Sequence, residues 1–313
     1  MALISTPVVV RTPATSANLG PGFDTFGLAL ARYDHVEARV TGSGVVVEVS
    51  GEGAGELPGD ETHLVARAMA AAFDLLGEVP DGLLLRCAND IPQARGLGSS
   101  SAAIVGGILA ARALTVDGAA KLDDAAVLAL ASELEGHPDN VAPCLLGGFT
   151  IAYEENGVGR AVRLTPSPDV TPVVYVPSVR GLTAEARAAL PSDVPHADAA
   201  FNAGRAALLV HALTVDPELL LSATEDRLHQ DYRAPGMPAT SALVRQLRAA
   251  GIPAVVSGAG PTVLALIRPG EIAPEPGPPW RKWQVRVDVS GAAVAQGTIG
   301  HAERDPVAAG RES

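Results

Sequence analysis

The spacing of apolar residues in the first part of the chain predicts strands that alternate with helices. Residues 61–76 carry apolar side chains at intervals of three and four, as one face of a helix does, and Gly77 ends the pattern. Two β-rich runs, 35–40 and 45–49, are separated by a Thr-Gly-Ser-Gly turn, and 83–88 predicts a further strand. This part of the chain is therefore expected to form a sheet with helices packed on it.

The same pattern extends through the remainder of the chain. Helices are predicted at residues 99–114, 122–135, 183–190, 198–213 and 240–250. Strands are predicted at residues 161–164, 173–176, 254–257, 263–267 and 284–289. A change of composition near Ser167 suggests two α+β domains, residues 1–165 and 166–300, followed by a polar and flexible tail, residues 301–313.

Composition and charge limit the class of partner. Hydrophobic residues make up 47% of the 313 positions and charged residues 19%, the balance of a folded globular chain. The net charge of −12 disfavours nucleic acids and anionic membranes as partners, because both carry negative charge. The cysteines, Cys87 and Cys144, are expected to be free thiols in a reducing compartment. Because we find neither a secretion signal nor an apolar run of membrane-spanning length, we expect a cytoplasmic protein.

A glycine- and serine-rich loop connects the strand predicted at 83–88 to the helix predicted at 99–114. Glycines let the backbone approach an anion and turn its N–H groups inward, and a helix N-terminus adds free N–H donors. No Lys follows the last glycine, so the loop is not of the Walker type, and a plain turn with a serine N-cap is the alternative. The loop predicted to bind nucleotide phosphates comprises Pro92, Gln93, Ala94, Arg95, Gly96, Leu97, Gly98, Ser99, Ser100, Ser101 and Ala102.

Two further segments of unusual composition flank this loop in the sequence. Residues 13–24 read Pro-Ala-Thr-Ser-Ala-Asn-Leu-Gly-Pro-Gly-Phe-Asp, and residues 257–262 read Ser-Gly-Ala-Gly-Pro-Thr. In this order the three segments resemble the signature motifs of the GHMP kinases, small-molecule kinases named for galactokinase, homoserine kinase, mevalonate kinase and phosphomevalonate kinase. Within that group, residues 13–24 and Gly-His-Pro-Asp-Asn-Val-Ala-Pro at 136–143 are most similar to the homoserine kinase branch. The resemblance runs from about Val10 to Ile267, which is most of the chain.

The resemblance implies a fold and a reaction. The fold would pair an N-terminal α+β domain, containing a left-handed βαβ unit, with a ferredoxin-like C-terminal domain that contributes Gly258 and Gly260 to the site. The reaction would transfer the γ-phosphate of ATP, with Mg²⁺, to the side-chain hydroxyl of L-homoserine, a step of threonine biosynthesis. Members of the family are often dimers, so a homodimer is also expected.

The resemblance also assigns substrate-binding side chains. Asn18 and Asp24 would bind the ammonium group of L-homoserine, and His137 would contact the substrate near its reacting hydroxyl, although a lone His is more often structural. Arg187 and Arg233 would bind its carboxylate, a role suited to the parallel N–H donors of a guanidinium group. Without the motifs, each Arg would be interpreted as a solvated charge on a helix or loop.

The metal and the reacting hydroxyl complete the implied site. Glu133 aligns with the family's Mg²⁺ carboxylate, and Ser100 would take part in catalysis by supplying a second oxygen. Glu135, on a different helix face, is the alternative to Glu133. Asn140 would hold the reacting hydroxyl, and because an amide takes up no proton at neutral pH, the hydroxyl would attack the γ-phosphate without a carboxylate base. Asp139 is the rival for that role.

Two other functions stay open from the sequence. Another GHMP kinase would act on mevalonate, shikimate or a sugar, but mevalonate and shikimate have no ammonium group for Asp24 to bind. A non-catalytic nucleotide-binding module is the second alternative, since domains of this type also occur in RNA-binding proteins. The net charge of −12 and the intact phosphate loop argue against it.

Overall fold

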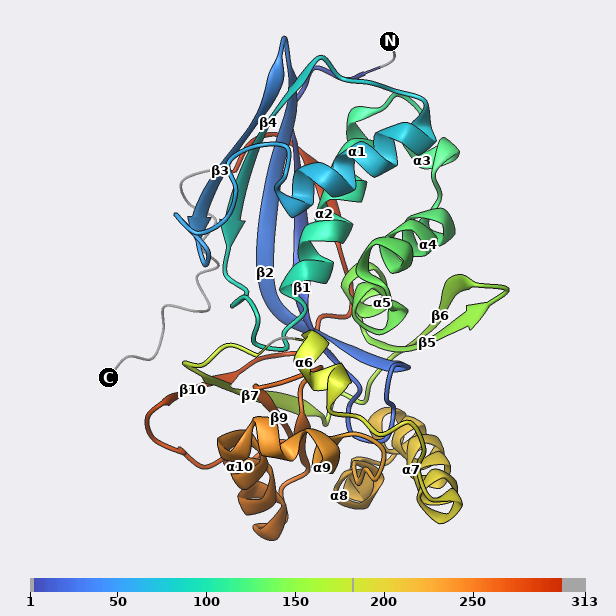
Figure 1. Ribbon diagram of the computed structural model, residues 1–313, viewed down its shortest axis with the longest axis vertical. Helices are drawn as coiled ribbons and strands as arrows, with labels where there is room; N and C mark the ends of the chain where they lie inside the picture. The colour runs from blue at the N-terminus through green and yellow to red at the C-terminus, as the bar shows by residue number, and fades with distance from the viewer. Residues whose placement is uncertain (1–2, 182, 300–313) are drawn as a thin grey trace.

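The computed structural model describes residues 3–181 and 183–299, which form two β-sheets with helices packed against them (Figure 1). The larger sheet has the order β11-β1-β2-β4-β3, and β5 extends it by pairing with β2 and with β6. Its strands are β1 Val8–Ala17, β2 Phe26–Thr41, β3 Gly44–Gly51, β4 Gly82–Asn89, β5 Phe149–Glu155, β6 Val158–Leu164 and β11 Ala293–Gln296. The smaller sheet has the order β10-β7-β9-β8. Its strands are β7 Thr171–Pro177, β8 Ala254–Val256, β9 Val263–Ile267 and β10 Trp280–Gln284.

The helices divide between the two sheets. Those packed with the larger sheet are α1 Leu64–Leu76, α2 Ser99–Leu114, α3 Gly118–Lys121, α4 Asp124–Glu135 and α5 Pro138–Leu146. Those associated with the smaller sheet are α6 Thr183–Ala188, α7 His196–Thr214, α8 Leu220–Ala223, α9 Gln230–Arg233 and α10 Pro238–Ala249. No helix within the described ranges is long and apolar enough to cross a bilayer.

Helix α2 lies at the centre of the larger half, between the sheet and α1. Its middle is made of small residues because its neighbours leave no room for larger ones. A Cβ on Gly107 would lie 2.5 Å from the Val65 carbonyl oxygen of α1, and one on Gly106 would lie 3.3 Å from Val36 of β2. This close packing fixes the N-terminus of α2, where the phosphate loop ends.

The predicted α+β fold is confirmed, although α5, β5 and β10 were not predicted and one predicted strand near the C-terminus is absent. We expected a strand at 284–289, but β10 ends at Gln284. The following residues run along β2, where Val287 and Leu30 form an isolated bridge. Regular pairing stops there because β2 is irregular where its register with β1 shifts.

The last strand of the described chain returns to the larger sheet. Strand β11 pairs antiparallel with β1, from Val8 opposite Gln296 to Arg11 opposite Ala293. The two sheets are separated in the sequence between Leu164 and Thr171, but by hydrogen bonding β11 belongs to the first sheet. The division into residues 1–165 and 166–300 stays a prediction, and the expected tail, 301–313, lies outside the described residues.

Candidate active site

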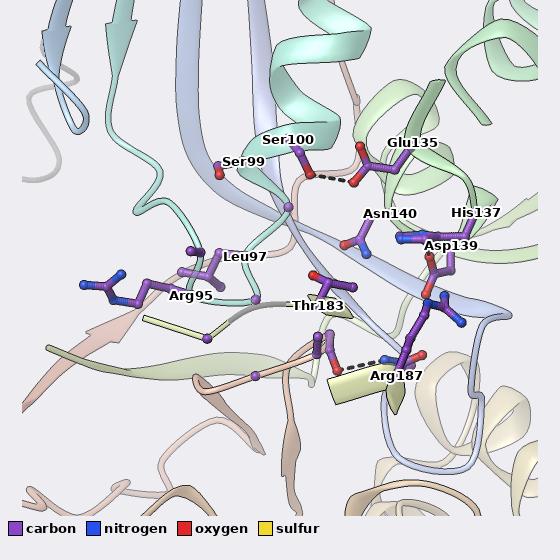
Figure 2. Close-up of a pocket in the computed structure, with 18 of the residues that line it drawn as sticks. Arg95, Leu97, Ser99, Ser100, Glu135, His137, Asp139, Asn140, Thr183 and Arg187 are labelled. Atoms are coloured by element: carbon purple, nitrogen blue, oxygen red, sulfur yellow. Dashed lines mark hydrogen bonds and ion pairs between the residues drawn. The ribbon is translucent and has the colours of Figure 1, made fainter. Parts of the chain in front are cut away.

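A pocket lies where the phosphate loop meets α5, α6 and the turn between β8 and β9 (Figure 2). It encloses about 640 Å³, open solvent included. Its lining residues are Asn18, Asp24, Ala94, Arg95, Gly96, Leu97, Gly98, Ser99, Ser100, Glu135, His137, Asp139, Asn140, Gly181, Thr183, Arg187, Arg233, Gly258, Ala259 and Gly260. Most of the predicted site residues are therefore brought together. Those that do not line the pocket are Pro92, Gln93, Ser101, Ala102 and Glu133.

The phosphate loop has a conformation that only glycine accommodates at two positions. Gly96 and Gly98 have φ angles of 74° and 70°, in the left-handed region. A Cβ on Gly96 would lie 2.2 Å from the carbonyl oxygen of Ser257, and one on Gly98 would lie 1.9 Å from Thr15 Oγ1. Helix α2 starts at Ser99 directly after Gly98, so its free N–H groups point into the pocket region. The predicted loop-to-helix geometry is present.

The turn at 257–262 is fastened directly to this loop. Ser257 Oγ donates to the carbonyl oxygen of Gly96 at 2.6 Å and lies 2.8 Å from Ser16 Oγ. Asn18 Nδ2 donates to the carbonyl oxygen of Gly258 at 2.8 Å. All three sequence motifs thus meet through short hydrogen bonds, and the second sheet supports the loop that the first sheet carries.

Arg95 holds the loop in place through its guanidinium group. The group donates to the carbonyl oxygens of Pro177 at 3.1 Å, Ser178 at 2.7 Å and Gln93 at 2.8 Å. Burial lowers the pKa of Arg95. Figure 2 shows its side chain directed away from the Glu135 and Asn140 side of the pocket. The side chain of Arg95 thus joins the loop to the end of β7, and the role of Arg95 in nucleotide binding stays a prediction.

The acidic residue beside the phosphate loop is Glu135. Its Oε1 accepts hydrogen bonds from Ser100 Oγ at 2.5 Å and Ser101 Oγ at 3.1 Å (Figure 2). Burial raises the pKa of the Glu135 carboxyl group, and the two serines partly oppose this. Glu133 is exposed and lies outside the pocket. The sequence-based choice of Glu133 is therefore corrected to Glu135 as the carboxylate next to Ser100.

Helix periodicity explains this correction. Residues two positions apart on an α-helix point about 200° apart, so Glu133 and Glu135 lie on nearly opposite faces. Glu135 follows the buried Ala131 by four positions and the buried Leu128 by seven, which places it on the inner face of α4. This spacing was readable in the sequence. The described residues contain no group of three or more His, Cys, Asp or Glu side chains arranged for a metal ion.

Asp24 and Arg187 both line the pocket and form an ion pair with each other. Two parallel hydrogen bonds of 2.9 Å join the guanidinium group of Arg187 to both carboxylate oxygens of Asp24. The bond to Asp24 raises the pKa of Arg187. The resemblance placed these residues at opposite ends of a substrate, whereas the structure pairs them with each other, because each satisfies the charge of the other.

The backbone of Asp24 is held by Asn18. Asn18 Oδ1 accepts from the Asp24 N–H at 2.9 Å, while its Nδ2 is engaged with Gly258. Both residues have left-handed φ angles, 68° for Asn18 and 53° for Asp24. The amide of Asn18 thus holds Asp24 and the turn at 257–262, and its predicted binding of an ammonium group stays a prediction.

Arg233 is the buried cation of the pocket. Its Nε donates to the carbonyl oxygen of Ala186 at 3.1 Å, its Nη1 lies 3.2 Å from His229 Nδ1, and its guanidinium carbon lies 5.1 Å from the Phe23 ring centroid. His229 Nε2 lies 2.8 Å from the carbonyl oxygen of Gly20, so Nε2 carries the proton and Nδ1 accepts from Arg233. Burial lowers the pKa of both side chains. Sequence reasoning missed His229, whose only signal was its position four residues before Arg233.

His137, Asp139 and Asn140 lie together at the start of α5 (Figure 2). His137 Nδ1 and Asp139 Oδ1 are 2.6 Å apart, and this hydrogen bond raises the pKa of His137. Asp139 is buried and bonded to His137, whereas Asn140 accepts a hydrogen bond of 2.8 Å from Thr15 Oγ1. Asn140 and its rival Asp139 thus both lie at the pocket, and the carboxylate of Asp139 already has a partner in His137.

Comparison with known proteins assigns this fold and pocket to a family. A model of the GHMP kinases N terminal domain matches residues 63–148, and a model of the GHMP kinases C terminal region matches residues 200–275. The homoserine kinase of Streptomyces avermitilis is 60% identical over 290 residues, which cover 92% of this chain and 95% of that protein. The chain belongs to the homoserine kinase family of GHMP kinases.

Other members of the homoserine kinase family agree with this assignment. The homoserine kinase of Clavibacter michiganensis subsp. michiganensis is 52% identical over 296 residues, covering 92% of this chain and 93% of that protein. The crystal structure of homoserine kinase from Cytophaga hutchinsonii matches with a TM-score of 0.81 at 26% identity, covering 93% of this chain and 98% of that chain. The homoserine kinase fold expected from the motifs is therefore confirmed.

Proposed function

We propose that the protein transfers the γ-phosphate of ATP to the side-chain hydroxyl of L-homoserine, giving O-phospho-L-homoserine for threonine biosynthesis. The observation that carries this proposal is the pair of Asp24 and Arg187 beside the phosphate loop. An amino acid zwitterion can exchange with such a pair, its ammonium group binding Asp24 and its carboxylate binding Arg187. The pair is 40% exposed at Arg187 and 36% at Asp24, so the exchange costs little.

The nucleotide phosphates would bind to the backbone N–H groups of Gly96 to Ser100 and to the start of α2. Glu135 and Ser100 would hold Mg²⁺, which prefers oxygen ligands and commonly uses one or two carboxylates with phosphate oxygens. The raised pKa of Glu135 supports this assignment, because a partly desolvated carboxylate gains from a nearby cation. When bound there, Mg²⁺ would neutralise charge on the phosphate groups.

In the transfer step, the hydroxyl oxygen of L-homoserine forms a bond to Pγ while the bond from Pγ to the departing ADP oxygen breaks. The hydroxyl proton moves to a phosphoryl oxygen. Asn140 positions the hydroxyl, and Asp139 stays hydrogen-bonded to His137. Arg233 adds a second cation for the substrate carboxylate, held in place by His229 and by the carbonyl oxygen of Ala186.

The choice of acceptor is tested with alcohols that differ from L-homoserine in one feature. ADP release would be measured with L-homoserine, with its analogue lacking the amino group, with mevalonate and with shikimate. We expect kcat/KM for L-homoserine to exceed that of the deaminated analogue by about 100-fold or more. The analogue has no ammonium group, so the carboxylate of Asp24 would lose its partner when Arg187 binds the substrate carboxylate. In Asp24→Asn this preference is expected to shrink. Equal or better turnover of mevalonate or shikimate would exclude homoserine as the substrate, and tight ATP binding without turnover would indicate a binding module.

Two further expectations are carried as proposals from the family. The protein would be a homodimer and would reside in the cytoplasm. Light scattering of the purified full chain tests the first, since a mass of one chain at micromolar concentration contradicts it.

A further inference from the structure

The hydroxyl group of Thr15 lies between the phosphate loop and the residue assigned to the reacting hydroxyl. Thr15 is fully buried in β1, and its backbone N–H donates to the carbonyl oxygen of Leu97 at 3.0 Å. Its Oγ1 donates to Asn140 Oδ1 at 2.8 Å. A Cβ on Gly98 would lie 1.9 Å from this Oγ1 and 3.3 Å from Asn140 Oδ1. The Thr15 hydroxyl therefore occupies the space that the absent side chain of Gly98 leaves.

We propose that Thr15 is a positioning residue of phosphoryl transfer, whose hydroxyl fixes the Asn140 amide with Nδ2 turned toward the acceptor hydroxyl. An amide group is planar, so a bond that holds Oδ1 on one side places Nδ2 on the other. A buried hydroxyl needs an acceptor for its proton, and Asn140 Oδ1 provides it. This inference rests on the proposed function, because it concerns the same acceptor hydroxyl.

The orientation of the amide has a chemical consequence. With Nδ2 facing the substrate, the acceptor oxygen receives a hydrogen bond, and its own proton is not held by Asn140. That proton is free to pass to a phosphoryl oxygen while the new O–P bond forms and the bond to ADP breaks. With the amide reversed, Oδ1 would hold the hydroxyl proton and oppose this transfer. Thr15 thus decides which of the two arrangements Asn140 offers.

Thr15 also sets the spacing between the two reactants. It is in contact with Gly98, the last residue before α2, and with Asn140 of α5. A single side chain therefore spans from the phosphate loop to the acceptor side. Thr12 is a matched reference on the same strand, because it is equally buried and its hydroxyl makes only a long contact of 3.4 Å to the Asp34 carbonyl oxygen.

The test compares Thr15→Val, Thr15→Ser and Thr12→Val in the full-length protein with ATP, Mg²⁺ and L-homoserine. Valine keeps the shape of threonine and removes the hydroxyl. We expect Thr15→Val to lower kcat about 10-fold or more while KM for both substrates changes less than about threefold. Thr15→Ser retains the hydroxyl and should stay within about threefold of wild type, as should Thr12→Val. Thermal unfolding of each variant separates loss of folding from loss of orientation.

A second measurement asks whether Thr15 acts through Asn140. If it does, Thr15→Val lowers kcat in the wild type but has no further effect in the Asn140→Ala background. Additive losses would overturn the proposal, as would a Thr15→Ser variant as slow as Thr15→Val or a Thr12→Val variant equally impaired. If the wild type prefers another alcohol, the proposed substrate fails and the same comparisons with that alcohol judge Thr15. A wild type inactive on every alcohol overturns both.

Discussion

One side of the pocket is formed mainly by backbone groups, and the other mainly by charged side chains. On the side proposed for the nucleotide, the surface is formed by the backbone of Gly96 and Gly98, where contacts closer than van der Waals distance exclude a side chain. On the side proposed for the acceptor alcohol, the pocket is lined by charged side chains such as Asp24 and Arg187. Gly96 and Gly98 are two residues apart in the sequence, whereas the side-chain pair joins residues 163 positions apart. The loop leaves no room for an added Cβ at Gly96 or Gly98, whereas a solvent-exposed ion pair is held only weakly.

The largest loss of activity is expected from Gly98→Ala in the phosphate loop. The added Cβ would meet Thr15 Oγ1 at 1.9 Å, in a residue whose φ of 70° already disfavours alanine. We expect kcat/KM to fall about 1,000-fold, because both the loop and Thr15 must move. Gly77→Ala is the matched control, since Gly77 has a φ of 72° and nothing within 4 Å of an added Cβ. It should lose about 1 kcal/mol of stability and no activity, and equal losses in both variants would contradict the steric argument.

The next test concerns Glu135, the carboxylate that is hydrogen-bonded to Ser100 and Ser101. Glu135→Gln is expected to raise the Mg²⁺ concentration for half-maximal activity about 100-fold, because a neutral amide replaces the proposed metal carboxylate. Glu133→Gln changes the exposed neighbour on the other face of α4 and should leave the Mg²⁺ titration unchanged. The initial rate is measured against free Mg²⁺ at saturating ATP. A larger effect of Glu133→Gln would restore the original sequence-based assignment.

On the acceptor side, Arg233→Lys should weaken substrate binding without affecting the nucleotide. Lysine has no planar fork, so it would lose the contacts to Ala186 and His229. KM for L-homoserine is expected to rise about 10-fold while KM for ATP stays constant. Arg227→Lys is the control, because Arg227 is exposed and pairs with Asp198 at 3.0 Å outside the pocket. Parallel increases in both KM values would indicate a general loss of structure.

The smallest predicted effect concerns Asp34, a buried carboxyl group next to the start of the phosphate loop. Its Oδ1 accepts the N–H groups of Asp90 at 2.7 Å and Ile91 at 2.9 Å, directly before the phosphate loop. Burial raises the pKa of Asp34 from 3.8 to about 7. Because the folded-state pKa is the higher one, the stability contribution of Asp34 is complete below pH 4 and is lost as the pH rises through 7.

Asp34→Asn removes this titration and keeps an oxygen for both N–H groups. Between pH 6 and pH 8, the free energy of unfolding of the wild type should fall by about 1 kcal/mol more than that of the variant. Urea unfolding at the two pH values measures this difference. Identical pH dependence in the two proteins would show that Asp34 does not titrate in this range.

The same contrast explains what the sequence could predict. The phosphate loop was predictable because its conformation depends on neighbouring residues, namely the spaced glycines and the helix that follows them. Strand and helix order followed from apolar periodicity, and the fold followed from three motifs. The pairing of Asp24 with Arg187 was not predictable, because nothing local connects them. His229 was missed because a histidine in a polar run carries no signal until Arg233 is seen beside it. The choice of Glu135 over Glu133 was predictable, since the helical period of α4 places only Glu135 on the face of the buried Leu128 and Ala131.

The return of β11 to β1 affects how the chain can fold during synthesis. On the ribosome, Val8 to Arg11 emerge well before their outer partner, Ala293–Gln296. Until then the outer edge of β1 offers unpaired N–H and C=O groups to any passing strand. A fragment that ends at residue 165 would keep that edge open permanently and is expected to aggregate. The amino-terminal half is therefore complete only when the carboxyl-terminal strand has been made.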